Sequence, residues 1–154
     1  MLNINTKAPE FTLNNHDGDI VRLSNLAGKP LIVYFYPQDD TPGCTTEACN
    51  FRDDYSEFEG LGVEIIGISP DTVESHQEFR KKHHLPFTLL SDPDHQTAKL
   101  YGVWGQKEKE GIEYEGIYRT TFIVDKKGDI VKIFEGVDPS SHSQEVLEEI
   151  KRIV

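Results

Sequence analysis

The chain has 154 residues, 36% of them hydrophobic and 10% aromatic, which is enough to build the core of one globular domain. Its formal net charge of -11 argues against binding to nucleic-acid phosphates or anionic membranes. No stretch approaches the ~18 apolar residues of a membrane span, and the N-terminus lacks the features of a signal peptide. Two cysteines are too few for a secreted disulfide framework, so we expect a single cytoplasmic domain over residues 1–154.

The first part of the chain predicts a β-hairpin followed by a buried strand. Short apolar stretches at 11–13 and 20–23 flank an Asp-Gly pair, which is a strong turn signal. A turn over 24–28 then leads into LIVYFY at 31–36. This apolar run is too short for a typical helix and rich in aromatic and β-branched residues, so we expect a strand buried on both faces.

A helix follows this strand. Thr41 and Pro42 predict its N-cap and first residue, and Gly60 lies near its expected end. One helical face carries apolar side chains: Ala48, Phe51, Tyr55 and Phe58. Cys44 falls in the first turn, where unpaired N–H groups and the helix dipole favour thiolate over thiol. Cys44 is therefore a candidate nucleophile.

A second strand is predicted over 63–69, and the intervening helix makes it parallel to the first. Asp71 and Glu74 have the spacing of a capping box. We therefore expect a second helix that runs to about His83 and is closed by Pro86.

The remaining chain predicts, in order, a short strand or extended segment, a helix, an exposed loop with some hairpin character, two antiparallel strands and a final helix: residues 87–90, 92–101, 105–116, 118–124 with 130–134, and from about Asp138 and Pro139 onward. The loop reads GQKEKEGIEYEG, whose charge is typical of a solvated segment. The last helix has an apolar face of Val146, Leu147, Ile150 and Ile153. A βαβ unit followed by ββα is the element order of the thioredoxin fold.

One string ties this fold to a family. YFYPQDDTPGCTTEACNFRD, at 34–53, resembles peroxiredoxins of the bacterioferritin comigratory protein type, also called the Q type. Pro37, Thr41 and Cys44 stand there in the pattern P-x-x-x-T-x-x-C, and APEF at 8–11 also matches the family. The resemblance implies the peroxiredoxin variant of the thioredoxin fold, α/β with a central mixed sheet, flanking helices and an N-terminal hairpin. It also implies that Cys44 attacks peroxide and that Cys49 resolves the product.

A second motif of the family is an arginine followed by Thr-Phe and an apolar run ending in Asp, which RTTFIVD at 119–125 matches with one residue between. The resemblance implies that Arg119 stabilises the Cys44 thiolate and the developing oxyanion. Thr41 can orient the thiolate or peroxide, and Pro37 can shield the site. Each also has an ordinary interpretation: Arg119 as a solvated strand residue, Thr41 as an N-cap and Pro37 as a turn former.

The resemblance implies an activity and partners. The enzyme would reduce hydrogen peroxide and organic hydroperoxides through a sulfenic acid and a Cys44–Cys49 disulfide, which thioredoxin or a similar dithiol then reduces. We expect a monomer with no cofactor and no metal. Two alternatives stay open: a thiol–disulfide oxidoreductase without peroxidase activity, although that class usually shows Cys-x-x-Cys, and a zinc module that combines both cysteines with His76 or His83.

Other residues keep two interpretations. Glu47 and Arg52 brace the site or are surface charges, and Trp104 packs near the site rather than reacting. His83 and His84 are surface residues or partners of a helix dipole.

The spacing of the cysteines predicts a conformational change. Residues five apart on a regular helix have Cα atoms ~8.6 Å apart. A disulfide needs them within about 7 Å. Residues 44–49 must therefore leave the helix before the two sulfurs can join.

Overall fold

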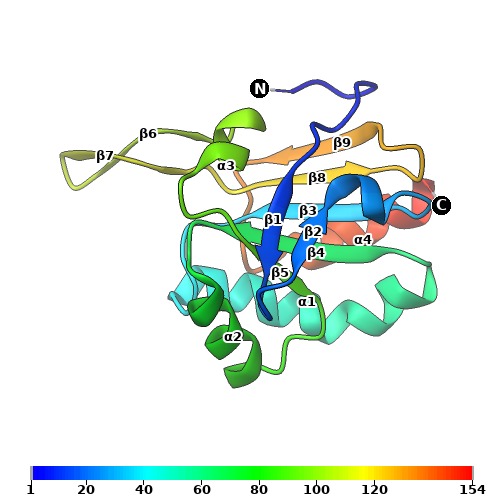
Figure 1. Ribbon diagram of the computed structural model, residues 1–154, viewed down its shortest axis with the longest axis horizontal. Coiled ribbons are helices and arrows are strands. Elements are labelled where there is room, and N and C mark those ends of the chain that lie inside the picture. The colour runs from blue at the N-terminus through cyan, green and yellow to red at the C-terminus, as the bar shows by residue number, and fades with distance from the viewer. Residues whose placement is uncertain (1, 154) are drawn as a thin grey trace.

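The computed structural model describes residues 2–153 and contains a seven-stranded mixed sheet in the order β2-β1-β5-β4-β3-β8-β9 (Figure 1). Its strands are β1 Thr12–Asn15, β2 Ile20–Arg22, β3 Leu31–Phe35, β4 Glu64–Ser69, β5 Thr88–Ser91, β8 Thr120–Val124 and β9 Ile130–Glu135. The three central strands β3, β4 and β5 are parallel, and the flanking strands pair antiparallel. The expected mixed sheet of the thioredoxin fold is confirmed.

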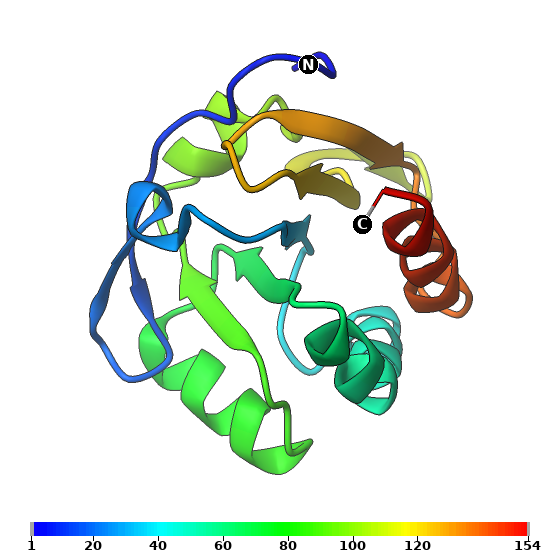
Figure 2. The same ribbon diagram turned by 90° about the vertical axis from the view of Figure 1, so that its right-hand side faces the viewer.

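Helices cover both faces of the sheet (Figure 2). One apolar layer joins the sheet to α1 Pro42–Gly60, α2 Val73–Lys82 and α4 His142–Ile153. The opposite layer joins it to α3 Gln96–Leu100 and to the short 3-10 helix η1 Leu23–Leu26. Strand β3 is buried throughout, because Ile32 and Tyr34 enter the first layer while Val33 and Phe35 enter the second.

Several expected elements are confirmed. The N-terminal hairpin is formed by β1 and β2, and the second hairpin by β8 and β9. Strands β3 and β4 are parallel neighbours joined by α1, whose Ala48, Phe51 and Phe58 are buried in the helical layer. No helix in the described part of the chain is long and apolar enough to cross a membrane.

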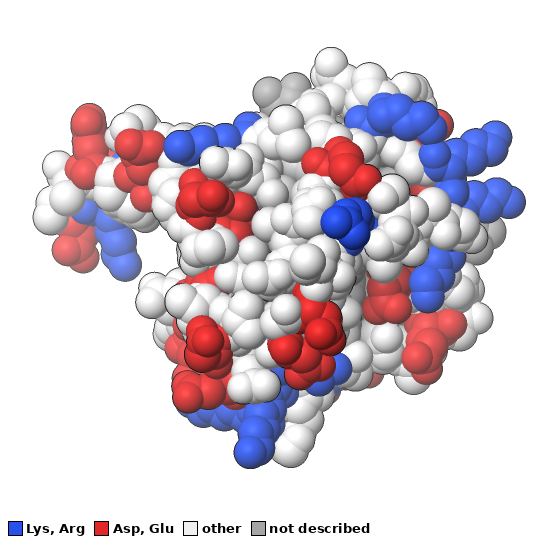
Figure 3. All heavy atoms as spheres, in the orientation of Figure 1, with Lys and Arg blue, Asp and Glu red and all other residues white. Residues whose placement is uncertain are grey.

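The segment expected as an exposed loop with some hairpin character is a regular hairpin. Strands β6 Trp104–Lys109 and β7 Ile112–Ile117 pair antiparallel along their whole length and project from the body (Figure 1). Charges of both signs cover this projection (Figure 3). Strand β7 alternates apolar and polar residues as IEYEGI, but β6 reads WGQKEK without that alternation, and Ile112 and Tyr114 are exposed instead of packed in the core.

The capping box predicted at Asp71 and Glu74 is wrong. Thr72 caps α2, because its hydroxyl oxygen accepts from the backbone N–H of Ser75 at 3.1 Å. The Asp71 carboxylate instead accepts from the Asp39 N–H at 2.7 Å and from the Ser69 hydroxyl. A tertiary contact therefore takes the side chain that local sequence assigned to the helix end.

Two other helices begin later than expected. Helix α3 starts at Gln96, although the Asp92 carboxylate still accepts from the N–H groups of Thr97 and Ala98. Helix α4 starts at His142 rather than near Asp138. Its Val146, Leu147 and Ile150 are buried as predicted, whereas Ile153 is exposed.

Candidate active site

Cys44 lies in the first turn of α1, at the carboxyl end of β3, as the sequence predicts. Pro42 is the first helical residue, and the N–H of Thr45 donates to the carbonyl of Thr41 at 2.8 Å. Cys44 is only 1% exposed and packs in the same layer as Ala48. Its thiol is therefore placed at the positive end of a long helix and shielded from bulk water.

Arg119 reaches this thiol from the segment just before β8, the strand that pairs with β3. It directly precedes β8, and Thr120 of that strand pairs with Phe35 at the end of β3. Arg119 Nη2 consequently lies 3.1 Å from Cys44 Sγ, and Nη1 lies 3.1 Å from Glu47 Oε1. The structure thus brings together the cysteine and arginine that are 75 residues apart in the chain.

Glu47 belongs to the same cluster, which resolves the two interpretations left open by the sequence. Its side chain is 1% exposed and forms an ion pair with Arg119, whose side chain is 20% exposed. Burial raises the pKa of Glu47 to about 7, and the neighbouring guanidinium offsets only part of that effect. Glu47 is a buried acid that titrates near neutral pH.

Gly43 allows the guanidinium to approach. A Cβ at this position would lie 2.9 Å from Arg119 Nη2 and 3.6 Å from the ring of Pro139. Any side chain here would push Arg119 away from Cys44, which gives a steric reason for glycine beside the thiol.

Thr41 and Pro37 lie in the turn that leads from β3 into α1, just before Cys44. Thr41 occupies the N-cap position, but within the described structure its hydroxyl donates to the Gln38 carbonyl at 2.9 Å rather than capping α1. Thr41 and Pro37 line a cavity of about 400 Å³ whose opposite wall is the β6–β7 hairpin, including Trp104 and Lys107. This cavity gives a small molecule a place beside the first turn of α1.

Cys49 lies further along the same helix and is half-buried. Both sulfurs are thiols, and α1 is continuous across them. The structure therefore shows the reduced arrangement, in which a helix holds the two cysteines apart.

The remaining candidates lie away from the sulfur. Trp104 stacks on His95, with ring centroids 3.9 Å apart, and lines the cavity, as its predicted packing role requires. Arg52 donates to the carbonyl of His83 at 2.8 Å, so it joins α1 to the end of α2 instead of bracing the site. The His83 ring bonds to Asp40 at 3.0 Å.

Sequence reasoning missed a buried polar network that anchors the turn between β3 and α1. His76 Nδ1 lies 2.7 Å from an oxygen of Asp39, and His76 Nε2 lies 2.9 Å from the Leu90 carbonyl. The Tyr36 hydroxyl and the Ser75 hydroxyl donate to the same Asp39 carboxylate. These bonds tie the turn that carries Pro37 and Thr41 to α2 and β5.

The network also bears on the zinc alternative. Within residues 2–153, the group of three side chains spaced to hold a metal is Asp39, Asp71 and His76, and it contains neither cysteine. His76 is already hydrogen-bonded to the Asp39 carboxylate, and the Asp71 carboxylate accepts from the Asp39 backbone N–H and the Ser69 hydroxyl. A zinc module built on Cys44 and Cys49 has no support in this arrangement.

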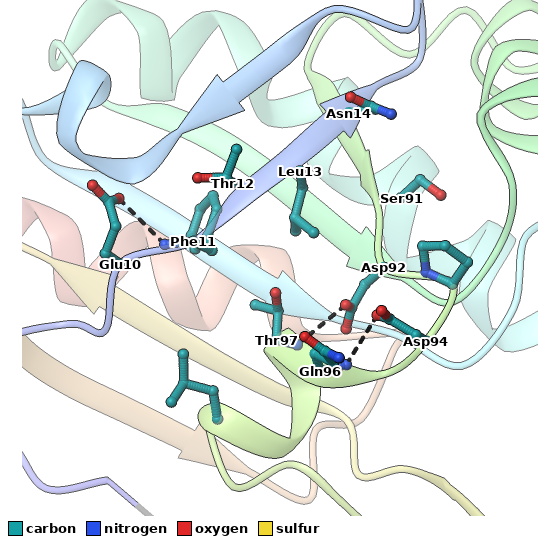
Figure 4. A pocket seen from close by; sticks show the side chains of 12 residues that line it. Glu10, Phe11, Thr12, Leu13, Asn14, Ser91, Asp92, Asp94, Gln96 and Thr97 are labelled. Atoms are coloured by element: carbon teal, nitrogen blue, oxygen red, sulfur yellow. Dashed lines mark hydrogen bonds between the residues drawn. The ribbon is translucent and has the colours of Figure 1, made fainter.

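A separate cavity of about 520 Å³ lies between β1 and the segment leading into α3 (Figure 4). Asp92 and Asp94 in its wall accept bonds from backbone N–H groups at the start of α3. Its acids serve the local backbone, and neither cysteine lines it.

Known proteins are similar to this chain in sequence and in fold. Residues 4–133 match the AhpC/TSA family. Peroxiredoxin Bcp of Bacillus subtilis is 46% identical over 97% of this chain and 96% of its own, and Peroxiredoxin Bcp of Escherichia coli is 44% identical over 94% and 92%.

Solved structures agree with this grouping. A mutant of Xanthomonas campestris peroxiredoxin Q superposes with a TM-score of 0.92 and 33% identity, covering 99% of this chain and 100% of that one. A complex of the Xanthomonas campestris bacterioferritin comigratory protein, studied for alkyl peroxide reduction, gives a TM-score of 0.90 over 97% and 98% of the two chains, also at 33% identity. The chain therefore belongs to the AhpC/TSA family, as a thiol-dependent peroxidase of the bacterioferritin comigratory protein or Q type.

Proposed function

We propose that Cys44 is the peroxidatic nucleophile and reduces hydrogen peroxide and organic hydroperoxides. The observation that carries this proposal is the 3.1 Å contact between Arg119 Nη2 and the sulfur of a buried cysteine at a helix N-terminus. The thiolate attacks the terminal peroxide oxygen, the O–O bond breaks, and Cys44 becomes a sulfenic acid. Water or an alcohol leaves, and Arg119 stabilises the negative charge on the departing oxygen.

Organic hydroperoxides fit the surroundings of the thiol. The cavity of about 400 Å³ lined by Pro37 and Thr41 has room for an alkyl group next to the turn that leads into Cys44. Alkyl peroxide reduction by the Xanthomonas campestris relative supports the same substrate class.

Cys49 is the resolving residue in this proposal. Its thiol attacks the sulfenic acid, water leaves, and a Cys44–Cys49 disulfide forms after the first turns of α1 unwind. A thiol reductant returns the enzyme to the dithiol state, and we assign this role to thioredoxin acting on a monomer. A redox cycle that restores two thiols suits a reducing compartment, so we place the reaction in the cytoplasm.

Stopped-flow measurement of peroxide consumption tests the assignment. Cys44→Ser should abolish the reaction in the first turnover as well as in the steady state. Cys49→Ser is the matched control and should retain the first turnover but lose recycling by thioredoxin. Full activity in Cys44→Ser would show that another group attacks the peroxide.

A further inference from the structure

The site contains two buried acids that share one cation. Cys44 and Glu47 are each 1% exposed, and both contact amino groups of the same guanidinium, Arg119. If both acids ionised, a net negative charge would remain in a region from which water is excluded, and removing each ion from water costs several kcal/mol.

Other titratable groups face this cluster from the neighbouring elements, and none of them contacts the Glu47 carboxyl within the described chain as Arg119 does. Tyr34 on β3 feels the charges of Glu47 and Cys44, and its hydroxyl is buried without a hydrogen-bond partner in the described chain. Lys107 on β6 donates to the carbonyl of Ile117, and its ammonium also interacts with Arg119 and Cys44, which makes it a second cation near the thiol. His142 on α4 bonds to Thr121 and Glu145, and Asp39 is held by His76.

Burial therefore favours a state in which the two acids hold one proton between them. Burial raises the pKa of Glu47 to about 7, so its carboxyl can keep a proton while Cys44 is a thiolate.

We propose that Glu47 stores the proton that the leaving oxygen of the peroxide takes up. This inference rests on Cys44 being the nucleophile. The sulfur attacks the terminal oxygen of ROOH, an S–O bond forms, the O–O bond breaks, and RO⁻ leaves with the bonding electrons. The Glu47 proton passes to RO⁻ to give ROH, while Cys44 becomes a neutral sulfenic acid and Glu47 a carboxylate.

The geometry suits this transfer because the negative charge stays next to the positive guanidinium of Arg119 throughout. Arg119 contacts the Cys44 sulfur through Nη2 and the Glu47 carboxyl through Nη1 at the same time, so one cation adjoins the group that is charged before the reaction and the group that is charged after it. The oxygen that departs from the terminal peroxide oxygen, when held by Arg119, is next to the guanidinium that also contacts Glu47. Glu47 thus acts as the acid that protonates the leaving oxygen, while Arg119 holds the charge.

Two oxidants separate this role from a structural one. Alkoxide from tert-butyl hydroperoxide needs a proton, whereas acetate from peracetic acid leaves as a stable anion. Glu47→Gln keeps an oxygen for Arg119 but loses the acidic proton. Its rate at pH 6 should fall on the order of 100-fold with tert-butyl hydroperoxide, the usual size of an acid–base contribution. The rate with peracetic acid should change little.

Controls keep the test decisive. Glu47→Asp should recover part of the lost alkyl hydroperoxide rate because it restores an acid. Glu59→Gln, at an exposed position of the same helix, should leave both rates unchanged. Equal losses with both oxidants, or no loss with either, would overturn the proton role. Neither outcome bears on the nucleophile, which Cys44→Ser tests separately.

Discussion

Oxidation of the two cysteines to a disulfide should unwind the start of α1. The helix runs unbroken from Pro42 to Gly60 and contains both sulfurs. Five residues along a regular helix separate Cα atoms by ~8.6 Å and turn the side chains ~140° apart. A disulfide requires a Cα separation of at most about 7 Å and converging Cβ atoms. The bond is therefore incompatible with the reduced structure.

The extent of this unwinding follows from the hydrogen-bond pattern. If residues 42–49 leave the helix, the N–H groups of residues 46–53 lose their acceptors four residues earlier. The hydrogen bond from the Thr45 N–H to the Thr41 carbonyl is lost as well. Residues from Asp54 onward keep theirs, and Asp54 also accepts from Ser143 of α4 at 2.7 Å. Two turns should open while the rest of α1 stays in place.

Amide hydrogen exchange in the reduced and oxidised enzyme measures this directly. If these amides open in the reduced protein at a cost of ~4 kcal/mol, their exchange should become about 1000-fold faster on oxidation. Cys49→Ser treated with peroxide is the control, because it cannot form the disulfide. Equal protection of residues 45–53 in both redox states would refute the reasoning. Loss spread evenly to Gly60 would show general destabilisation instead.

Three further changes have expected outcomes. Arg119→Ala should raise the pH at which the thiolate absorbance appears and slow peroxide reduction. Arg119→Lys should restore only part of the lost rate, because the planar fork of the guanidinium is missing. An unchanged pH of thiolate formation and an unchanged rate in Arg119→Ala would give Arg119 a structural role. Gly43→Ala should slow peroxide reduction in stopped-flow assays, because its Cβ would lie only 2.9 Å from Arg119 Nη2 and push the guanidinium away from Cys44, with a melting temperature near that of the parent. Glu47 has a pKa raised by burial from 4.5 to about 7, so its contribution to stability is present below pH 4.5 and lost as pH rises through 7. In urea unfolding, the free energy of unfolding of Glu47→Gln minus that of the parent should therefore rise by on the order of 3 kcal/mol between pH 4 and pH 8. A difference in unfolding free energy that stays constant over this pH range would contradict the reasoning.

The elements that sequence predicted well are those with local signals. Strand β3 is a continuous apolar run, and α1 has an N-cap, a proline and a clear apolar stripe. The place of Arg119 came from a resemblance, because nothing local shows that β8 pairs with β3. The β6–β7 hairpin was underestimated because both of its faces are largely exposed.

Glu47 could have been assigned from the sequence. It lies three residues after Cys44 and four before Phe51, which places it on the buried stripe of α1. A charged residue at such a position is either paired or functional.

The Asp39–His76 network had no comparable signal. These residues are 37 apart in sequence and meet only because α2 packs against the end of β3. Asp71 illustrates the same limit, since its local spacing suggested a helix cap while the folded protein uses it to hold Asp39.

Trapping of the first sulfenic acid tests the central claim most directly. Each single-cysteine variant, Cys49→Ser and Cys44→Ser, receives one equivalent of hydroperoxide in the presence of a reagent that labels sulfenic acids, and mass spectrometry locates the label. We predict label on Cys44 in Cys49→Ser within the first turnover and none in Cys44→Ser. Label on Cys49 in Cys44→Ser, with an unlabelled Cys44 in the other variant, would contradict the account.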